Sequence, residues 1–408
     1  MRQIGYRTVT DLDVAGKTVL LRVDYNVPFK PGSTDISDTG RIKASLPTVR
    51  HLLEQGSKIV ICSHLGRPNG RVVEEMRMAP VVHGLSELLG VPVKLVNNCT
   101  GPTVRKAVDR LGPGEILVLE NLRFHPGEES NDPEFASQLA SLADVYVNDA
   151  FGSAHRAHAS IEGVTRFLPS AAGFLMGREL DLLGRALHLP ALPFAAILGG
   201  AKTSDKIAAL VNLARRVDLL IIGGGMAATF IKARGMEVGR SPVEEDRIGS
   251  VTDLIYTTQE RGRKVLLPVD FVVADSFSAD AKHRVVDVTE IPPKWHIMDI
   301  GPRTIALFEE ALKPCKTVIW NGPMGVFEWE PFSQGTRRVA EIVSSLDGAT
   351  TLVGGGSTAE AIEGLGLGDK VTQVSTGGGA SLEMLTGRVL PGVAALMDTK
   401  SPVLTSEV

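Results

Sequence analysis

The chain has 408 residues, more than one ordinary core holds, so two domains are expected. Its composition, 43% hydrophobic and 22% charged, is that of a globular protein, and its formal net charge of −4 offers no basic surface for nucleic acid or anionic lipid. The three cysteines lack metal-ligand spacing, no N-terminal signal is visible, and no run reaches about 18 apolar residues, so we expect a cytoplasmic protein without a membrane partner.

Short β-branched runs alternate with helical patterns in the first half. The predicted strands cover 17–25, 58–64, 93–96, 115–121 and 145–149, and helical patterns lie at 43–55, 79–89 and 133–142. Such alternation is typical of βαβ units around a mostly parallel sheet, in which ligands bind outside the carboxyl ends of the strands. Residues with distinctive chemistry follow these strands, namely Asp24, Asn26, His64, Arg67, Arg123, Asn148 and Asp149.

These residues have simpler explanations that must be weighed. Asp24 and Asn26 often only make turns, and a single histidine is more often structural than a ligand. His155 and His158 lack the HExxH pattern of a zinc site. Arginines at several strand ends are harder to explain without a ligand, because guanidinium groups bind phosphate and carboxylate in bidentate fashion. The first half therefore predicts an anion site.

The second half repeats this plan. Residues 169–187 are rich in leucine and predict one long connecting helix, after which strands are expected near 194–198, 218–222, 264–267, 317–320, 350–353 and 371–374. Four glycine-rich loops follow such strands, at 195–202, 218–226, 351–358 and 373–381. Glycine lets backbone N–H groups approach a ligand, and a helix N-terminus favours anions. The four loops predict a polyphosphate site.

The first of these loops also carries two lysines. Lys202 and Lys206 are four residues apart, so a helix that begins near Thr203 would direct both ammonium groups to one side. The simpler reading, a solvated helix start, is less favoured here because Gly199 and Gly200 precede the pair.

Other nucleotide motifs are weak. The string at 14–18 resembles part of a P-loop, but Asp11 stands where the first glycine is required. The loops at 223–228 and 354–359 satisfy a loose dinucleotide pattern, whose acidic residue about 20 positions on would be Glu244, in a stretch that does not resemble a strand end. An NAD-dependent oxidoreductase remains an alternative.

The string VIWNGPMGVFE at 318–328 joins a strand to a Gly-Pro turn with Trp320, Asn321 and Glu328. Such a turn can wall a base and offer Glu328 to ribose hydroxyls, or it can be purely structural. No G-x-S-x-G motif and no Cys-His pairing is evident, so the chemistry is not expected to need a side-chain nucleophile.

Taken together, these motifs resemble the phosphoglycerate kinase family. The strings that match are RVDYNVP, SHLGRP, ENLRF, NDAFGSAHRAHAS, GGAKTSDKI, IIGGGMA, WNGPMGVFE and STGGGASLEMLTGRVLPGVAALMD, collinear from about residue 4 to 398. The resemblance implies an α/β fold of two Rossmann-like three-layer lobes with mostly parallel sheets, joined by a long interdomain helix. The implied parts are an N-terminal lobe of 1–170 with the tail 390–408, the helix at 171–187, and a C-terminal lobe of 188–389.

The resemblance also implies site residues. For 3-phosphoglycerate they are Asp24, Tyr25, Asn26, Arg41, His64, Leu65, Gly66, Arg67, Arg123 and Arg156. For the nucleotide they are Gly200, Ala201, Lys202, Lys206, Gly224, Gly225, Asn321, Pro323, Val326, Glu328, Gly354, Gly355, Gly356, Ser357 and Thr358. The implied catalytic set is Arg41, Lys202, Gly356 and Gly379, with Arg41 and Lys202 stabilising the migrating phosphoryl group.

The implied activity is reversible phosphoryl transfer between 1,3-bisphosphoglycerate with ADP and 3-phosphoglycerate with ATP, by hinge closure in a monomer. Mg²⁺ would be held through the nucleotide phosphates. Members of the family commonly carry Asp after the third glycine of the 354–356 loop, where it helps bind the metal, whereas this chain has Ser357. A hydroxyl is a poorer Mg²⁺ ligand than a carboxylate. A non-catalytic anion-binding protein is therefore a second alternative.

Overall fold

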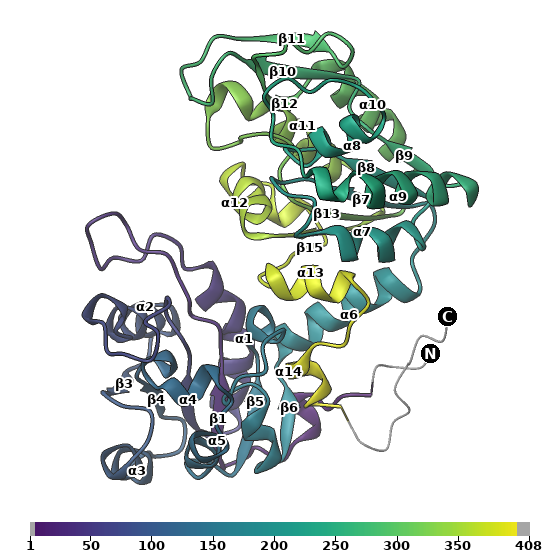
Figure 1. Ribbon diagram of the computed structural model, residues 1–408. Helices are drawn as coiled ribbons and strands as arrows, with labels where there is room; N and C mark the ends of the chain where they lie inside the picture. The colour runs from purple at the N-terminus through teal and green to yellow at the C-terminus, as the bar shows by residue number, and fades with distance from the viewer. Residues whose placement is uncertain (1–4, 398–408) are drawn as a thin grey trace. The chain divides into compact units, whose positions relative to one another are not determined.

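The computed structural model describes residues 5–397 and separates them into two compact units (Figure 1). The first contains the described residues up to Asp181 together with those from Val389 onward, and the second contains Leu182–Arg388. The predicted tail beyond residue 397 lies outside the described residues.

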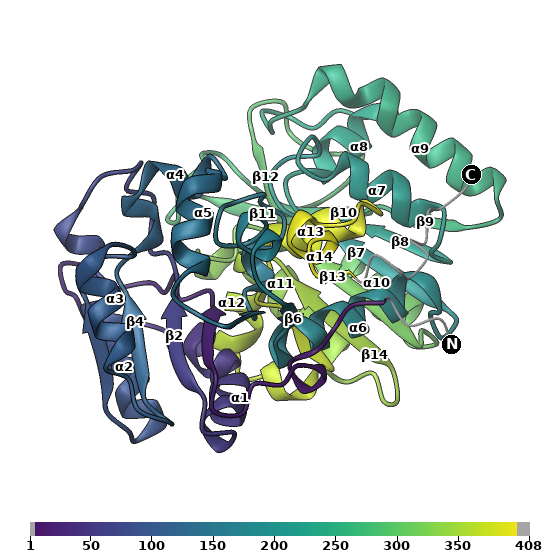
Figure 2. The ribbon, with the colours of Figure 1, turned by 90° about the horizontal axis from the view of Figure 1, so that it is seen from below.

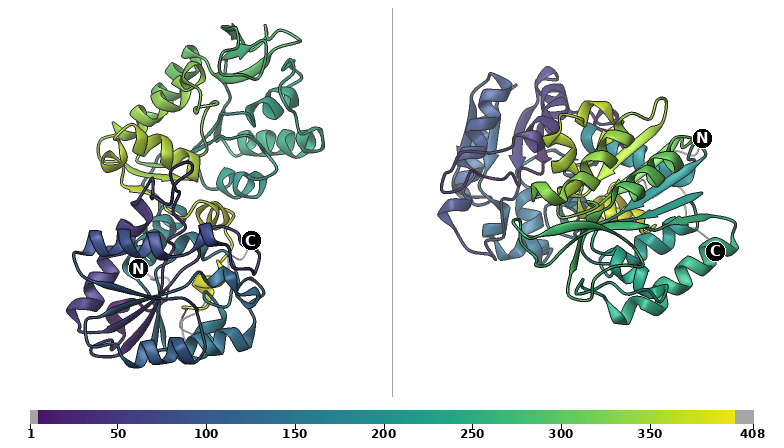
Figure 3. Two further views of the ribbon diagram at one scale, coloured as in Figure 1. Left: turned by 90° about the vertical axis from the view of Figure 1, so that its left-hand side faces the viewer. Right: turned by 90° about the horizontal axis from the view of Figure 1, so that it is seen from above.

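The first unit is built on a six-stranded parallel sheet. Its strands lie in the order β3 (Val93–Val96), β4 (Ile116–Leu119), β2 (Lys58–Cys62), β1 (Thr18–Arg22), β5 (Val145–Asn148) and β6 (Ser170–Ala172). The longer helices are α1 (Gly40–Glu54), α2 (Ala79–Leu89), α3 (Pro102–Asp109) and α5 (Pro133–Ala140), with short helices α4 (Pro126–Glu129) and α14 (Pro391–Ala394). Helices lie on both faces of this sheet (Figure 3).

The register of the central strands positions the loops that follow them. Arg22, the last residue of β1, is paired with Cys62 of β2 and with Asn148 of β5. The three strands are almost wholly buried and consist largely of Val, Ile and Leu, as expected for a parallel sheet covered on both faces. Their carboxyl ends therefore stop at one level, and the segments after them emerge side by side.

The second unit contains a similar sheet. Its parallel strands lie in the order β15 (Gln373–Val374), β14 (Thr350–Gly354), β13 (Thr317–Asn321), β7 (Phe194–Leu198), β8 (Leu219–Ile222) and β9 (Lys264–Leu266). The helices are α7 (Ile207–Ala214), α8 (Ala227–Ala233), α9 (Ile248–Glu260), α10 (Pro302–Leu312), α11 (Gln334–Ser344), α12 (Gly356–Gly364) and α13 (Gly379–Leu385). Helices α7, α8 and α9 lie on one face of the sheet, with α10 and α11 on the other (Figure 2). The predicted fold class is confirmed.

Two elements differ from the sequence-based prediction. A three-stranded antiparallel sheet, in the order β11 (His283–Asp287), β10 (Asp270–Ala274) and β12 (His296–Ile300), was not foreseen. The connecting helix α6 is Phe174–His188 rather than 169–187, because residues Ser170–Ala172 pair with β5 as strand β6. Among the described residues, no helix combines the length and apolar character that a bilayer crossing requires.

Candidate functional site

A cluster of charged side chains lies at the carboxyl edge of the first sheet. Asp24 follows β1, and Arg41 lies in the first turn of α1. Nη1 of Arg41 is 2.7 Å from Oδ1 of Asp24, and the Ser153 hydroxyl donates to Oδ2 at 3.3 Å. Burial favours the neutral acid, but the neighbouring His64, Arg41 and Arg22 favour the carboxylate and hold the pKa of Asp24 well below its usual range. Asp24 therefore holds Arg41 in place as an ionised partner.

His64 is buried beside this ion pair. Its Nδ1 lies 3.2 Å from Nη2 of Arg22, and a guanidinium can only donate, so Nδ1 is the acceptor and Nε2 carries the proton. Burial, against the attraction of Asp24, holds the pKa of His64 well below its ordinary value. His64 is thus a neutral donor through Nε2.

The loop after β2 is fixed at Gly66. Oδ1 of Asn26 accepts the Gly66 N–H at 2.8 Å, and Nη1 of Arg123 donates to the Gly66 carbonyl at 2.7 Å. Gly66 has a φ of 64°, in the left-handed region that favours glycine, and a Cβ there would lie 2.7 Å from the sulfur of Met76. The side chain of Arg67, next in the chain, is exposed. Asn26, Gly66 and Arg123 are thereby brought together as the sequence suggested.

Asn121 organises the same loop and was missed by the sequence analysis. Its Oδ1 accepts the N–H groups of Leu65 and Arg123 at 3.2 and 3.1 Å, and its Nδ2 donates to the carbonyls of Leu65 and Met76 at 2.7 and 3.0 Å. The side chain is fully buried. Its place after a strand within ENLRF was the only signal that could have found it.

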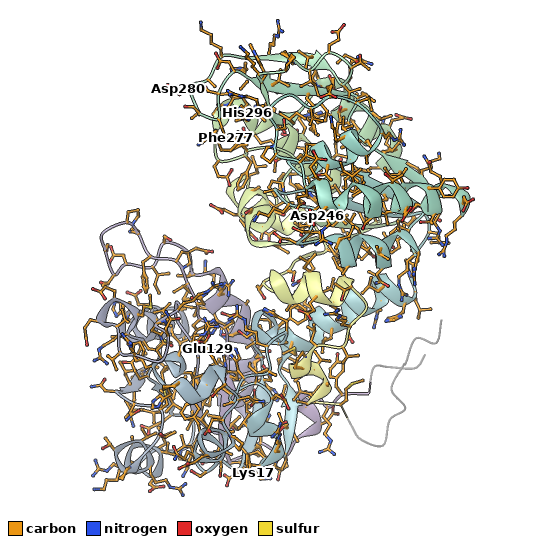
Figure 4. All side chains as sticks on the ribbon, in the orientation of Figure 1. Lys17, Glu129, Asp246, Phe277, Asp280 and His296 are labelled. Carbon is orange, nitrogen blue, oxygen red and sulfur yellow. The ribbon has the colours of Figure 1, made fainter. Side chains whose placement is uncertain are left out.

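The arginines of this edge are held close to one another. Burial first, and then the charge of Arg156, lowers the pKa of Arg123 to about 10. Nε of Arg123 is 3.2 Å from Glu129, labelled in Figure 4, and Nε of Arg156 donates to Nε2 of His155 at 3.2 Å. Neighbouring guanidinium groups repel one another, and a bound anion stabilises such a cluster because it offsets this repulsion.

A buried polar chain lies behind these residues. Nε of Arg22 donates to the Ser160 hydroxyl at 2.8 Å, and Glu128 accepts the hydroxyl and N–H of Ser160 at 2.6 and 3.0 Å. Burial raises the pKa of Glu128, with Arg22 acting in the opposite direction. Glu128 and Ser160 carried no sequence signal, because their partnership spans 32 positions.

Two predicted substrate residues lie in the interior. The Tyr25 hydroxyl is 2.8 Å from that of Ser45, its N–H donates to the Ser63 hydroxyl at 2.9 Å, and its carbonyl accepts from Val27 at 2.8 Å. Leu65 is 2% exposed, and both of its backbone groups bond to Asn121. These two residues support the edge from within.

In the second unit, three glycine loops pack against one another. The N–H groups of Gly199 and Gly200 donate to the carbonyls of Asn321 and Pro323, at 3.0 and 2.8 Å, and that of Gly224 donates to Met324 at 3.0 Å. A Cβ on Gly224 would lie 2.4 Å from the nitrogen of Gly200. We expected the N–H groups of these loops to be available to phosphate. This is wrong for Gly200 and Gly224, because both N–H groups are bonded to backbone carbonyls and the two loops pack closely.

The predicted lysine pair is also corrected. Helix α7 begins at Ile207, not near Thr203, so Lys202 and Lys206 do not share a helical face. Lys206 turns inward, where its ammonium donates to the Gly199 carbonyl at 2.7 Å and to the carbonyl and Oδ1 of Asn321 at 2.9 and 2.7 Å. Burial lowers the pKa of Lys206 to about 8. Lys202 is exposed, as is the preceding Ala201.

The loop after β14 offers a helix N-terminus. Gly354 ends β14, Gly355 has a φ of 93°, and Gly356 begins the nine-residue helix α12. The first N–H groups of a helix have no acceptor inside it. Ser357 is exposed within this first turn, whereas the buried Thr358 accepts the Gly322 N–H on its hydroxyl at 2.7 Å. This terminus can bind phosphate oxygens.

The segment after β13 is anchored at both ends. Met324 donates its N–H to the Thr336 hydroxyl at 3.0 Å, and Val326 donates to the Met298 carbonyl at 2.9 Å. These bonds leave Glu328 exposed and Pro323 half-buried. Next to Glu328, the Trp329 ring lies 5.0 Å from that of Phe277, which is 61% exposed and is labelled with His296 in Figure 4.

Two further predicted residues of the second unit are Gly225 and Gly379. Gly225 is exposed beyond β8, and Gly379 begins the short helix α13. Gly377 donates its N–H to the Ser375 hydroxyl at 3.1 Å, which holds the preceding turn.

The donors of the second unit suit phosphate better than a bare metal. Within residues 5–397, no group of three or more His, Cys, Asp or Glu side chains is arranged to hold a metal ion. The N–H groups at the start of α12 suit phosphate oxygens, and the exposed hydroxyl of Ser357 is an oxygen ligand for a metal that arrives bound to such phosphates.

The alternative of a dinucleotide site required Glu244 as the acidic residue that binds the ribose. One carboxylate oxygen of Glu244 accepts the N–H groups of Thr203 and Ser204, the latter at 3.0 Å. Glu244 is thus engaged with the backbone of the 199–206 loop rather than placed for a ribose.

Known proteins resemble the chain over nearly all of its length. The family model described as phosphoglycerate kinase matches residues 9–388. A phosphoglycerate kinase of Moorella thermoacetica is 55% identical over 391 residues, covering 96% of this chain and 99% of the relative, and one of Roseiflexus sp. is 55% identical over 394 residues, with the same coverage.

Solved structures agree. The phosphoglycerate kinase from Coxiella burnetii matches with a TM-score of 0.85 at 40% identity, over 96% of this chain and 98% of that one. The enzyme from Pyrococcus horikoshii also gives a TM-score of 0.85, at 34% identity, with the same coverage.

Proposed function

The chain belongs to the phosphoglycerate kinase family, and from this premise we propose that it transfers a phosphoryl group reversibly from ATP to the carboxylate of 3-phosphoglycerate, giving ADP and 1,3-bisphosphoglycerate. It is then a phosphotransferase of glycolysis and gluconeogenesis with a carboxyl group as acceptor. The observation that carries the proposal is the cluster of cationic side chains at the edge of the first sheet, where Asp24 holds Arg41 at 2.7 Å and Arg123 donates to the Gly66 carbonyl at 2.7 Å.

The first unit binds the acceptor. Arg67, Arg123 and Arg156 bind the phosphate of 3-phosphoglycerate. Asp24 and Asn26 bind or orient its other polar groups. His64 donates a hydrogen bond to it through Nε2. Arg41, held by Asp24 at 2.7 Å, is placed for the migrating phosphoryl group. The support for these roles is the density of cationic donors in the segments that follow four neighbouring strands, β4, β2, β1 and β5.

The second unit binds the nucleotide. The N–H groups of Gly356 and its neighbours, with Gly379 and the exposed ammonium of Lys202, contact phosphates, and Glu328 binds the ribose. The loops at 200–201, 224–225 and 321–326 shape the pocket wall, and Lys206 and Asn321 hold them together. The residue that would help hold Mg²⁺ on these phosphates is Ser357, and the metal would supply neutralisation of phosphate charge there.

No general base is required, because the acceptor carboxylate is ionised near neutral pH. Catalysis rests on alignment and on cationic donors around the equatorial oxygens. Each ligand binds to a different unit, so we include hinge closure, in a monomeric cytoplasmic enzyme, as part of the proposal.

A coupled assay with ATP, Mg²⁺ and 3-phosphoglycerate tests the proposal, with NADH oxidation dependent on a linked dehydrogenase as the expected result. NADH or NAD⁺ turnover without the coupling enzyme would instead support an oxidoreductase, and binding of 3-phosphoglycerate without turnover would indicate a non-catalytic anion-binding protein.

A further inference from the structure

The segment 199–206 carries Lys202 and joins β7 to α7 without forming a helix of its own. Its two ends are fixed locally. Gly199 and Gly200 donate to the turn after β13, and the Lys206 N–H donates to the Thr203 carbonyl at 2.9 Å. The N–H groups of Thr203 and Ser204, in the middle, need a partner from elsewhere.

That partner is one oxygen of Glu244, 40 positions further along the chain. Oε2 accepts the N–H of Ser204 at 3.0 Å and also that of Thr203. One carboxylate thus performs for this turn what a side-chain cap performs for a helix N-terminus. It also occupies two N–H groups that would otherwise attract a phosphate.

Glu244 is itself held in place. Its N–H donates to the hydroxyl of Thr229, a buried residue of α8, at 3.2 Å. Three residues earlier, the buried Ser241 accepts the N–H of Ile297, in β12, at 2.8 Å. The carboxylate therefore connects the 199–206 segment to α8 and to the small sheet.

The electrostatics fit an ionised acceptor. Partial burial acts to raise the pKa of Glu244, but hydrogen bonds from Ser204 and Thr203 outweigh it and hold the pKa below its ordinary value. Among residues 5–397, Glu244 has no ion-pair partner within salt-bridge distance. Its charge is directed at backbone dipoles alone.

The Thr203 N–H belongs to the peptide group that follows Lys202. Because this group is planar and includes the Cα of Lys202, holding the Thr203 N–H also holds the atom from which the exposed Lys202 side chain leaves the backbone. A displacement of about 1 Å in a catalytic group can cost about 100-fold in rate.

We propose that Glu244 is a positioning residue for phosphoryl transfer, which acts by holding the Lys202 backbone through the N–H groups of Thr203 and Ser204. The inference deepens the proposed function and rests on the role given there to Lys202.

The test is a double-mutant cycle of Glu244→Ala and Lys202→Ala, with kcat measured for 3-phosphoglycerate phosphorylation by ATP. In the parent background, Glu244→Ala should lower kcat about tenfold or more, with the KM for 3-phosphoglycerate within about twofold. In the Lys202→Ala background, the same change should alter kcat less than about twofold, because the group that it positions is gone. Glu244→Gln, whose amide oxygen still accepts both N–H groups, should recover most of the activity.

The control is Glu245→Ala, which removes the same charge from the next position, where the side chain is exposed and has no hydrogen-bond partner among the described residues. It should leave kcat unchanged. An equal loss from Glu244→Ala in both backgrounds, or no loss in the parent, overturns the inference. If Glu244→Ala does not fold, Glu244→Asp is judged by the same criterion. A parent protein inactive with ATP and 3-phosphoglycerate would refute the proposed function itself, whereas an active parent with an additive cycle refutes only the role of Glu244.

Discussion

The ammonium group of Lys206 donates hydrogen bonds to two oxygens of Asn321, at 2.9 Å to the carbonyl and 2.7 Å to the side chain. With a third bond to the Gly199 carbonyl at 2.7 Å, this lysine connects the carboxyl ends of β7 and β13. A residue expected to reach toward phosphate is therefore a cross-link between the loops of the proposed nucleotide site.

Lys206 should give the protein a distinct pH dependence. Burial lowers its pKa to about 8 in the folded protein, against about 10.4 in an unfolded chain. Between these values the unfolded state binds more protons at this position, so stability from Lys206 rises with pH from about 8 to about 10.4 and is constant below 8. The free energy of unfolding of the parent minus that of Lys206→Met should rise by on the order of 2 kcal/mol across this range.

Urea unfolding of both proteins between pH 6.5 and 10.5 measures this difference. The comparison with the Met variant removes the titration of all other groups, which the two proteins share. A difference that stays constant over the whole range would contradict the shifted pKa.

Thr358 should contribute to stability through one hydrogen bond. Its buried hydroxyl accepts the Gly322 N–H at 2.7 Å, and valine has nearly the same shape but no acceptor. Thr358→Val should therefore lower the free energy of unfolding by about 1–3 kcal/mol, the cost of a buried unsatisfied donor. The same change should weaken ATP binding, because the lost bond holds Gly322, which lies between Asn321 and Pro323, two residues that we propose for the nucleotide site.

Urea unfolding and ATP titration check the two effects. Thr358→Ser keeps the hydroxyl and serves as the control, with a smaller loss expected in both measurements. Equal losses from Val and Ser would mean that the methyl group, rather than the hydrogen bond, matters.

Sequence reasoning placed together those candidate residues whose signal is local. Asp24, Asn26, His64 and Arg123 each follow a β-branched run directly, so strand prediction alone placed them at one sheet edge. The mostly parallel direction of the strands followed from the same alternation of runs, whereas their order in the sheet was not predicted.

What it missed depends on partners far apart in the chain. Lys206 is hydrogen-bonded to Asn321, 115 positions away, and Glu244 is hydrogen-bonded to Ser204, 40 positions away. These contacts hold the 199–206 segment in a conformation in which no helix begins at Thr203, and the Gly200 N–H is taken by the Pro323 carbonyl, 123 positions away. Local spacing carries no information about such partners, so the lysine pair was wrongly placed on one helix face.

The stability of the first unit should be sensitive to replacement of the Asn121 amide nitrogen by an oxygen. Its Nδ2 donates to the carbonyls of Leu65 and Met76, at 2.7 and 3.0 Å. Asn121→Asp replaces this donor with an acceptor facing two carbonyl oxygens in a buried site. We expect a loss of about 2–4 kcal/mol in the free energy of unfolding and a raised KM for 3-phosphoglycerate, since the Gly66 loop loses its support.

The exposed Asn97 provides the matched control, because Asn97→Asp adds the same charge to the surface of the same unit. Thermal unfolding and steady-state kinetics should show almost no change for it. Similar behaviour of the two variants would exclude the organising role of Asn121.

Lys202→Ala should separate turnover from acceptor binding. Lys202 is exposed and lies in the second unit, whereas the arginines that we propose for 3-phosphoglycerate lie in the first. Loss of a cation that acts on the migrating phosphoryl group should lower kcat by about 100-fold or more, with the Kd for 3-phosphoglycerate within about twofold. Steady-state kinetics and calorimetric titration measure the two quantities. Equal losses in kcat and in acceptor affinity would argue against this role.

Ser357 should set how strongly the nucleotide reaction depends on Mg²⁺. The residue lies exposed in the first turn of α12, where its neutral hydroxyl neither repels phosphate nor binds a cation strongly. An aspartate there would do both. Ser357→Asp should therefore lower the Mg²⁺ concentration for half-maximal activity by about three- to tenfold, and should weaken ATP binding measured without Mg²⁺.

The two opposite effects make the prediction specific. A change that only improved the fold of the loop would strengthen ATP binding with and without the metal, whereas a new metal ligand strengthens one and weakens the other. Ser357→Asn, which has the shape of aspartate without its charge, should resemble the parent in both assays. If Ser357→Asp leaves the Mg²⁺ dependence unchanged, the metal does not lie within reach of the α12 N-terminus, and another group must position the nucleotide phosphates.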